Sequence, residues 1–265
     1  MIDQVAEIVF NTRVTKNIFL IGLKSSHIAR LARPGQFVMV QVRKGIDPLL
    51  RRPFSICGTR DKDLFLILYK VVGKGTTILS ETRKGESISV LGPLGTAFEP
   101  SKSHKLSILV AGGMGVAPLY FLYQNINKKS VKFFAGFGSS DEIIKADRIL
   151  DLKIESAIAT DDGSEGHRGM VTGLLSDYLK QEEIKADFAS LYACGPLPML
   201  KTVSVMAAER KLPCYVSLET GMACGLGACQ GCAVRAYSEE IKYLHVCKDG
   251  PVFHAQEIDW ENVKV

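Results

Sequence analysis

The stretch Ser217-Leu-Glu-Thr-Gly-Met-Ala-Cys224-Gly-Leu-Gly-Ala-Cys229-Gln-Gly-Cys232 organises this chain, and a lone Cys247 follows it. The spacing C-x4-C-x2-C with a fourth cysteine further along matches that of plant-type 2Fe–2S proteins. The glycines of the stretch permit the tight turns that converging thiolates need. Their N–H groups can also donate hydrogen bonds to cluster sulfurs. We therefore expect a 2Fe–2S cluster held by Cys224, Cys229, Cys232 and Cys247.

Two other interpretations of the cysteines fit less well. A structural zinc site typically shows two C-x2–4-C pairs, whereas these ligands come as three plus one. Disulfides are typical of small secreted scaffolds, not of a 265-residue chain with seven cysteines. Three cysteines lie outside the pattern and are expected to be small buried hydrophobes: Cys57, Cys194 and Cys214.

Composition places the chain among globular proteins, with 46% hydrophobic and 23% charged residues. The net charge of +5 is spread out, with no basic run interleaved with aromatic residues, so we expect no nucleic-acid partner. No segment approaches about 18 uninterrupted apolar residues, and the N-terminus lacks a signal-peptide pattern. We expect no membrane association and, given free thiols and an iron–sulfur site, a cytoplasmic protein.

The first hundred residues have the pattern of an antiparallel β-barrel. Short alternating or β-branched apolar runs are separated by glycine and proline turns. Five or six strands at this spacing predict a small closed barrel. The clearest runs are 6–10, 18–21, 36–42, 63–69 and 86–91.

Within the barrel, Leu50-Arg-Arg-Pro-Phe-Ser55 is unusual for a structural strand, because Pro53 removes a ladder donor. A bound flavin explains the pattern, since an arginine can fork onto a pyrophosphate, an aromatic ring can lie against a flavin or adenine, and a serine hydroxyl can reach the flavin edge. The alternative is an edge strand capped by exposed arginines. The residues expected to bind FAD are Arg52, Pro53, Phe54, Ser55, Leu68, Tyr69, Lys70, Gly75 and Thr76.

From Ser103-His104 onward the pattern changes to alternating strands and helices, which predicts a parallel sheet. The apolar run 106–110 ends in Ala111-Gly-Gly-Met-Gly-Val-Ala-Pro118, and a helical pattern follows. Strand, glycine loop and helix present free N–H groups to a phosphate. The loop is not G-x-G-x-x-G, since Pro118 replaces the third glycine, so a simple Rossmann dehydrogenase is disfavoured.

The alternation continues with expected strands 131–137, 153–159 and 190–193 and helices 171–179 and 196–210. Ligands of such sheets bind at the carboxyl ends of the strands. The residues expected there to bind NAD(H) are Gly112, Gly113, Gly115, Cys194, Gly195 and Pro196. Cys194 is either a packed thiol or borders a nicotinamide. Asp161 and Asp162 are either solvated or contact a ribose, and their charge favours NAD(H) over NADP(H).

Together, these motifs resemble the ferredoxin–NADP reductase superfamily: Arg52-Pro-Phe-Ser55, Gly75-Thr76, Ala111 to Leu119 and Tyr192-Ala-Cys-Gly-Pro196. With the cysteine stretch, nearly the whole chain is similar to the electron-transfer subunits of NAD-dependent (class 1B) dihydroorotate dehydrogenases. The resemblance implies an FAD-binding β-barrel over 1–100, an NAD-binding α/β domain over 101–215 and a small 2Fe–2S module over 216–265. It also implies an FMN-containing dihydroorotate dehydrogenase catalytic subunit as partner, usually in a heterotetramer.

This combination predicts an oxidoreductase subunit without acid–base catalytic residues. Nicotinamide exchanges two electrons at once and 2Fe–2S one, so the flavin belongs between them. An apolar tail is a candidate for the partner contact, with local packing as the alternative: Tyr243, Val252, Phe253 and Trp260. Two rival functions remain. One is a homologous subunit of a sulfhydrogenase or of an NADH-dependent ferredoxin–NADP oxidoreductase, and the other is a binding module that has lost its cofactors.

Overall fold

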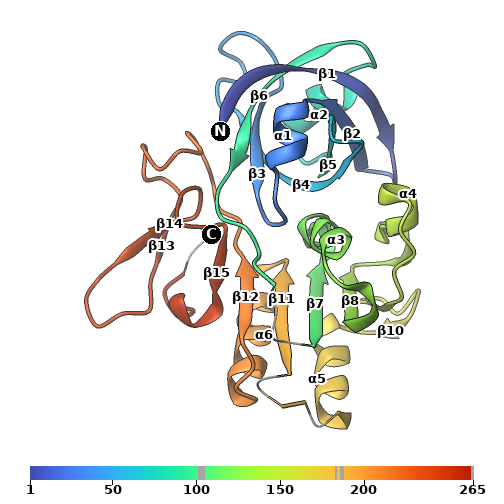
Figure 1. Ribbon diagram of the computed structural model, residues 1–265, viewed down its shortest axis with the longest axis vertical. Coiled ribbons are helices and arrows are strands. Elements are labelled where there is room, and N and C mark those ends of the chain that lie inside the picture. Colours follow the sequence, from blue (N-terminus) through green and yellow to red (C-terminus); the bar gives the residue numbers. More distant parts are fainter. Residues whose placement is uncertain (101–104, 183, 186–187, 264–265) are drawn as a thin grey trace.

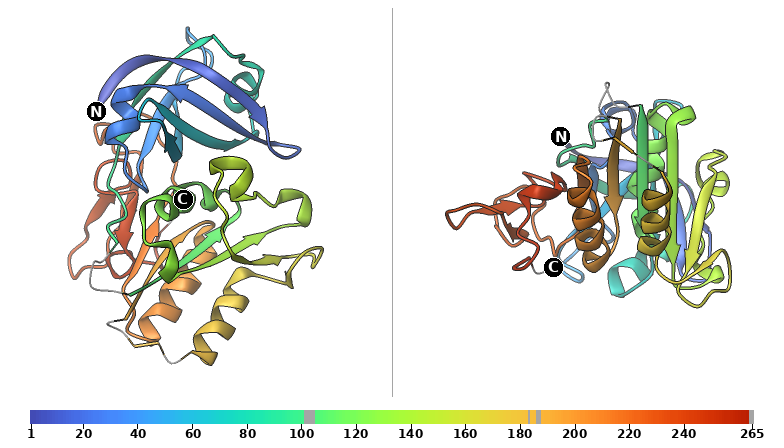
Figure 2. Two further views of the ribbon diagram at one scale, coloured as in Figure 1. Left: turned by 45° about the vertical axis from the view of Figure 1, so that its right-hand side comes forward. Right: turned by 90° about the horizontal axis from the view of Figure 1, so that it is seen from below.

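The computed structural model describes residues 1–100, 105–182, 184–185 and 188–263. An N-terminal barrel sits at one end of an α/β sheet, and the C-terminal segment lies beside both (Figure 1). In Figure 2 the outer part of this segment projects from one side of the molecule. The boundary expected between residues 100 and 101 adjoins residues 101–104, which lie outside the described residues.

Six antiparallel strands close the predicted barrel in the order β1-β2-β5-β4-β3-β6. The strands are β1 (Ile2–Arg13), β2 (Ile18–Lys24), β3 (Phe37–Gln41), β4 (Arg52–Arg60), β5 (Leu64–Lys70) and β6 (Ser87–Leu94). Two short helices that the sequence pattern did not predict accompany them, α1 (Ser26–Leu31) and α2 (Lys74–Glu81). Alternate residues of β2 belong to different cores: Ile21 packs inside the barrel, and Leu20 faces the α/β domain.

A seven-stranded sheet follows, in the order β10-β9-β8-β7-β11-β12-β15. Six strands are parallel. Four of them were expected: β7 (Leu106–Gly112), β8 (Val131–Phe137), β9 (Ser156–Thr160) and β11 (Ala189–Cys194). The short strands β10 (His167–Arg168) and β12 (Cys214–Ser217) were not predicted. The strand expected over 153–159 begins only at Ser156. The seventh strand, β15 (Val252–His254), pairs antiparallel with β12 and covers the sheet edge.

Helices cover both faces of this sheet (Figure 1), so its strands are apolar on both sides. In β7, Ile108 and Val110 pack in the core that contains α5 (Val171–Gln181) and α6 (Leu197–Glu209). Leu109 and Ala111 pack in the core that contains α3 (Val116–Asn125) and α4 (Ala146–Leu150).

Helix α3 also fixes the barrel onto the sheet. The Gln124 side-chain amide donates to the Thr59 carbonyl (2.9 Å) and accepts from the Thr59 N–H (3.2 Å). The Gln124 side chain thus bonds the backbone N–H and carbonyl of Thr59 in the way that a neighbouring strand would. The C-terminal turn of α3 is therefore held against the barrel.

The C-terminal segment carries the cysteine stretch, a hairpin of β13 (Ala233–Arg235) and β14 (Tyr243–His245), and β15. Val252 and Phe253, two of the four apolar residues considered for partner contact, are buried in β15. Trp260 donates its indole N–H to the Ala255 carbonyl (2.8 Å), so only Tyr243 is largely exposed, at 56%. The described residues contain no helix that has the length and apolarity to cross a membrane.

Candidate functional site

A cavity of about 400 Å³ lies where the barrel, the loop before α3 and the cysteine segment meet. Eight of the nine residues expected to bind FAD line it: Arg52, Pro53, Phe54, Ser55, Leu68, Tyr69, Lys70 and Thr76. They come from β4, from the adjacent strand β5 and from the first turn of α2. Strand pairing between β4 and β5 therefore brings together two motifs that are separate in the sequence.

Gly75, the ninth residue, lies beneath Arg52. A Cβ atom added to Gly75 would be 2.6 Å from Arg52 Nε, so only glycine leaves room for the guanidinium at this distance. The sequence predicted a glycine turn here, whereas Gly75 lies in the first turn of α2, which begins at Lys74. The N-terminus of a helix also presents free N–H groups beside an arginine, as a pyrophosphate requires.

Aromatic packing shapes the floor of this cavity. The Phe54 and Tyr69 ring centroids are 5.8 Å apart with the rings tilted, a favourable arrangement. The Tyr69 hydroxyl donates to Asn11 Oδ1 (3.0 Å), and burial raises the pKa of Tyr69 to about 12. Tyr69 is therefore a neutral, fixed wall at physiological pH.

Lys70 connects the barrel to the α/β domain. Its ammonium group lies 2.8 Å from a carboxylate oxygen of Glu142, in the loop after β8. The hydrogen bond from Lys70 lowers the pKa of Glu142, and the Gly138 N–H adds to this effect. Both side chains are about two-fifths exposed, so the ion pair orients the two units more than it stabilises them.

A second cavity, of about 290 Å³, lies at the carboxyl ends of β7 and β11. Five of the six residues expected to bind NAD(H) line it: Gly112, Gly113, Gly115, Gly195 and Pro196. A Cβ atom at Gly115 would collide with the Cys194 carbonyl oxygen, which explains the close approach of the two loops.

Cys194, the sixth residue, lies behind the wall of this cavity. It has no exposed surface, and burial raises the pKa of its thiol. The Ser217 hydroxyl interacts with it from β12. Its backbone therefore shapes the cavity while the thiol packs inside. Asp161 and Asp162 line neither cavity; the Asp162 carboxylate accepts from the Ser164 hydroxyl and N–H (2.6 and 2.9 Å), which lowers its pKa.

Met114, Leu218 and Glu219 line both cavities, so the two ligands would meet at these side chains. Sequence reasoning missed all three. Glu219 is accessible to solvent through the cavities, but protein atoms crowd its carboxylate and this burial raises its pKa. The position of this segment directly after β12, at the ligand-binding edge of the sheet, was the signal that could have found two of them.

The four predicted cluster cysteines lie in one loop region as two pairs. The Cys232 and Cys247 sulfurs are 3.2 Å apart and buried. The Cys229 N–H donates to the Cys224 sulfur (3.4 Å), as does the Leu226 N–H (3.3 Å). These donors lower the pKa of Cys224 to about 6, whereas burial raises that of Cys247 to about 12.

Two pairs of thiols fit a two-iron cluster. Among the described residues, no group of three or more cysteine, histidine or acidic side chains is placed to hold one metal ion. A tetrahedral zinc site needs four ligands around one ion, whereas each iron of a 2Fe–2S cluster takes two protein ligands. N–H groups directed at sulfur are also what cluster ligation requires. The four thiols and the N–H groups directed at their sulfurs therefore fit a 2Fe–2S cluster.

The largest cavity described, of about 790 Å³, lies elsewhere, against β8 and the segment that leads to β9. None of the predicted site residues lines it. Despite its volume, this cavity is therefore not part of the candidate FAD, NAD(H) and cluster sites.

Two family models match the chain: the iron–sulfur cluster binding domain of dihydroorotate dehydrogenase B over 219–259 and the oxidoreductase NAD-binding domain over 109–205. The dihydroorotate dehydrogenase B (NAD(+)) electron transfer subunit of Bacillus mycoides (strain KBAB4) is 39% identical over 258 residues, 95% of this chain and 96% of the relative. This chain belongs to that family. Another member, from Geobacillus sp. (strain WCH70), is 41% identical over 249 residues, 92% of this chain and 94% of that protein.

Solved structures place the family in a wider fold group. The structure of an NADH-dependent reduced ferredoxin-NADP oxidoreductase, studied for flavin-based electron bifurcation, has a TM-score of 0.81 and 31% identity, covering 97% of this chain and 91% of that one. A ferredoxin NADP+ reductase from Neisseria gonorrhoeae with bound FAD and NADP has a TM-score of 0.67 and 15% identity, covering 78% and 91%. The second likeness shows the fold alone.

Proposed function

We propose that this chain is the electron-transfer subunit of an NAD-dependent dihydroorotate dehydrogenase. In this role it passes electrons from the FMN of a catalytic subunit through a 2Fe–2S cluster and FAD to NAD⁺, in pyrimidine biosynthesis. One observation carries the proposal. In the continuous segment from Leu218 to Cys224, Leu218 and Glu219 line both cavities, and Cys224 is the first cluster cysteine.

Each of three parts of the chain would bind one of the three cofactors. In the barrel (1–100), Arg52 and the start of α2 would hold the FAD pyrophosphate, and Phe54, Ser55 and Leu68 to Lys70 would hold the flavin. In the α/β domain (101–215), the glycine loops and Pro196 would hold NAD(H). In the C-terminal module (216–265), Cys224, Cys229, Cys232 and Cys247 would ligate the cluster. FAD, when bound, exchanges electrons in pairs with nicotinamide and singly with iron–sulfur centres.

The protein itself orients and shields these groups. Met114 and Leu218 present apolar surface where the cavities meet, which limits water at the junction. The Lys70–Glu142 ion pair and the Gln124–Thr59 hydrogen bonds hold the barrel and the α/β domain in register. Positioning, not proton transfer, is therefore the function of the side chains named here.

The catalytic subunit would dock at the exposed end of the cluster loop, in a heterotetramer. Cys229 is exposed there, and Leu226 is 44% exposed. Nearby in the chain, Tyr237, Ile241 and Tyr243 of the hairpin region are more than half exposed. Large apolar side chains at a surface are typical of interfaces. A cytoplasmic location is part of the same proposal, supported by the seven cysteines, none of which forms a disulfide.

Purification of the chain with its catalytic subunit tests this function. We expect flavin and iron–sulfur absorbance, and NAD⁺ reduction that depends on dihydroorotate. A colourless chain after anaerobic reconstitution with iron, sulfide and flavin would contradict the cofactor assignment.

A second function has structural support. The bifurcating oxidoreductase structure is 31% identical and covers 97% of this chain. If the purified complex couples NADH and reduced ferredoxin to NADP⁺ reduction but does not oxidise dihydroorotate, that function replaces the first.

A further inference from the structure

Thr220 has an unusual side chain for its position. Among the described residues, only Thr220 Oγ1 and His27 Nε2 are buried side-chain polar atoms without a hydrogen-bond partner. Leaving such a group unsatisfied destabilises the fold, and each instance in a folded protein calls for an explanation. His27 lies in α1 and lines none of the cavities described above, whereas Thr220 lines the 400 Å³ cavity.

Three other polar side chains of this cavity already have partners within the protein. The Tyr69 hydroxyl donates to Asn11, and the Lys70 ammonium is bound to Glu142. The Thr76 hydroxyl donates to the Gly73 carbonyl (2.9 Å) and accepts from the Val72 N–H (2.9 Å). The Thr220 hydroxyl differs from these three groups because it is buried without a hydrogen-bond partner.

The backbone around Thr220 is fixed. Leu218 donates its N–H to the Pro251 carbonyl (2.9 Å), which ties the segment to the chain before β15. The neighbouring Glu219 lines both cavities, and Met222 lines the first. Thr220 itself lines only the first cavity, which holds the residues proposed to bind FAD.

We propose that the Thr220 hydroxyl binds the flavin ring of FAD and so orients it against the cluster loop. This inference rests on the proposed function. Thr220 is partly exposed as a residue, while its Oγ1 is closed off. Rotation of χ1 by one staggered step moves the hydroxyl into the position that the methyl group held, so the hydroxyl can be turned toward a ligand. The rim of a flavin carries the acceptors and the N–H donor that a hydroxyl can pair with.

Thr220→Val tests the assignment, because valine keeps the shape and removes the hydroxyl. In the cluster-loaded chain we expect FAD to bind on the order of tenfold more weakly by fluorescence titration. In the flavin-free chain we expect the thermal midpoint to stay the same or rise, since the variant removes an unsatisfied group. If the hydroxyl only stabilised the fold, Thr220→Val would instead lower the thermal midpoint of the flavin-free chain.

Two further variants complete the experiment. Thr220→Ser keeps the hydroxyl and is expected to bind FAD as the wild type does. Thr202→Val removes an exposed hydroxyl of α6 that donates to the Pro198 carbonyl, and it is expected to leave FAD affinity unchanged. Wild-type FAD affinity in Thr220→Val, equal losses in the Ser and Val variants, or a lowered flavin-free midpoint in Thr220→Val would each overturn the assignment. A wild-type chain that binds no FAD would instead overturn the proposed function.

Discussion

Met39 lies directly beneath Gly225: a Cβ atom built at Gly225 would be 2.6 Å from Met39 Cγ. Met39 is a fully buried residue of barrel strand β3, and Gly225 directly follows the first cluster cysteine. Met39 also packs in one core with Cys232 and Cys247. The cysteine loop therefore packs against the wall of the barrel.

Gly225→Ala is expected to displace this loop. The φ of Gly225 is +72°, so alanine adds left-handed backbone strain of about 1–2 kcal/mol to the contact with Met39. We expect an altered or partly lost iron–sulfur signal in electron paramagnetic resonance spectra of the reduced protein. Gly221→Ala is the control, since nothing lies within 4 Å of a Cβ at that position. Equal spectra for the two variants would contradict the inference that packing against Met39 positions the cysteine loop.

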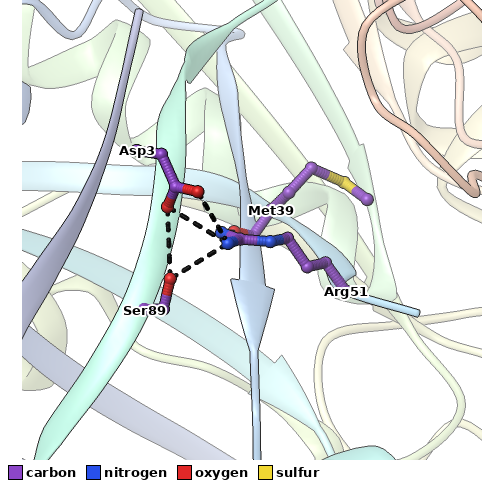
Figure 3. A network of polar contacts seen from close by, with 4 residues as sticks. All are labelled: Asp3, Met39, Arg51 and Ser89. Carbon is purple, nitrogen blue, oxygen red and sulfur yellow. Dashed lines mark hydrogen bonds and ion pairs between the residues drawn. The ribbon is translucent and has the colours of Figure 1, made fainter. Parts of the chain in front are cut away.

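Arg51 holds Met39 in place (Figure 3). Its guanidinium donates to both Asp3 carboxylate oxygens (3.1 and 2.9 Å), to the Ser89 hydroxyl (3.0 Å) and to the Met39 carbonyl (3.4 Å). One side chain thereby joins β1, β3 and β6. Arg51 is 22% exposed, whereas Asp3 is 57% exposed, so solvent screens part of the interaction.

Arg51→Gln is accordingly expected to lower the free energy of unfolding by about 1–2 kcal/mol. Arg51→Lys keeps the charge but not the planar fork, and it is expected to restore less than half of that loss. Chemical denaturation measures both. Arg33→Gln, which breaks the exposed pair with Glu99, is the control and is expected to change stability by less than about 0.5 kcal/mol. Full rescue by lysine would show that the fork geometry is unimportant.

Sequence analysis could predict those parts of the candidate site that consist of short, continuous motifs with characteristic residue types. Arg52 to Ser55, the loop from Gly112 to Gly115 and the cysteine spacing all have residue types that few structures other than ligand sites require. Each of these segments lies where the expected strand or loop places it. Strand alternation likewise predicted the barrel and four of the six parallel strands, but not the short strands β10 and β12.

Sequence patterns could not predict contacts that depend on how the units pack. Met114 and Leu218 are ordinary apolar residues, and only the docking of β12 beside β11 brings Leu218 to both cavities. Arg51 is indistinguishable from Arg52 in the sequence, yet it forms the network with Asp3. Strand β15 was missed because three residues carry too little periodicity to stand out from a loop.

Gly115→Ala is expected to damage nicotinamide binding selectively. The added methyl group would overlap the Cys194 carbonyl, so the loop before α3 must move away from β11. We expect the dissociation constant for NADH to rise on the order of tenfold or more, with FAD content unchanged. The matched control is Gly173→Ala in α5, where the new methyl group makes only an ordinary contact with His167. Unchanged NADH affinity in Gly115→Ala would remove this loop from the nicotinamide site.

The Lys70–Glu142 pair predicts a pH-dependent contribution to stability. The hydrogen bond from Lys70 lowers the pKa of the Glu142 carboxyl below its ordinary value of 4.5. A carboxyl with a lowered folded-state pKa stabilises the fold above its unfolded value, and this contribution is lost as pH falls through the folded value. Because both side chains are partly exposed, the contribution at pH 7 is at most about 1 kcal/mol.

Glu142→Gln is therefore expected to lower the thermal midpoint at pH 7 by a few degrees at most, and the difference from wild type should shrink below pH 4.5. Thermal unfolding of the flavin-free chain across this range measures the difference. The control is the same substitution in a Lys70→Met background, where the midpoint should no longer depend on residue 142. A difference that persists unchanged in acid, or that survives the loss of Lys70, would mean that Glu142 acts through the Gly138 N–H and not through the ion pair between the barrel and the sheet.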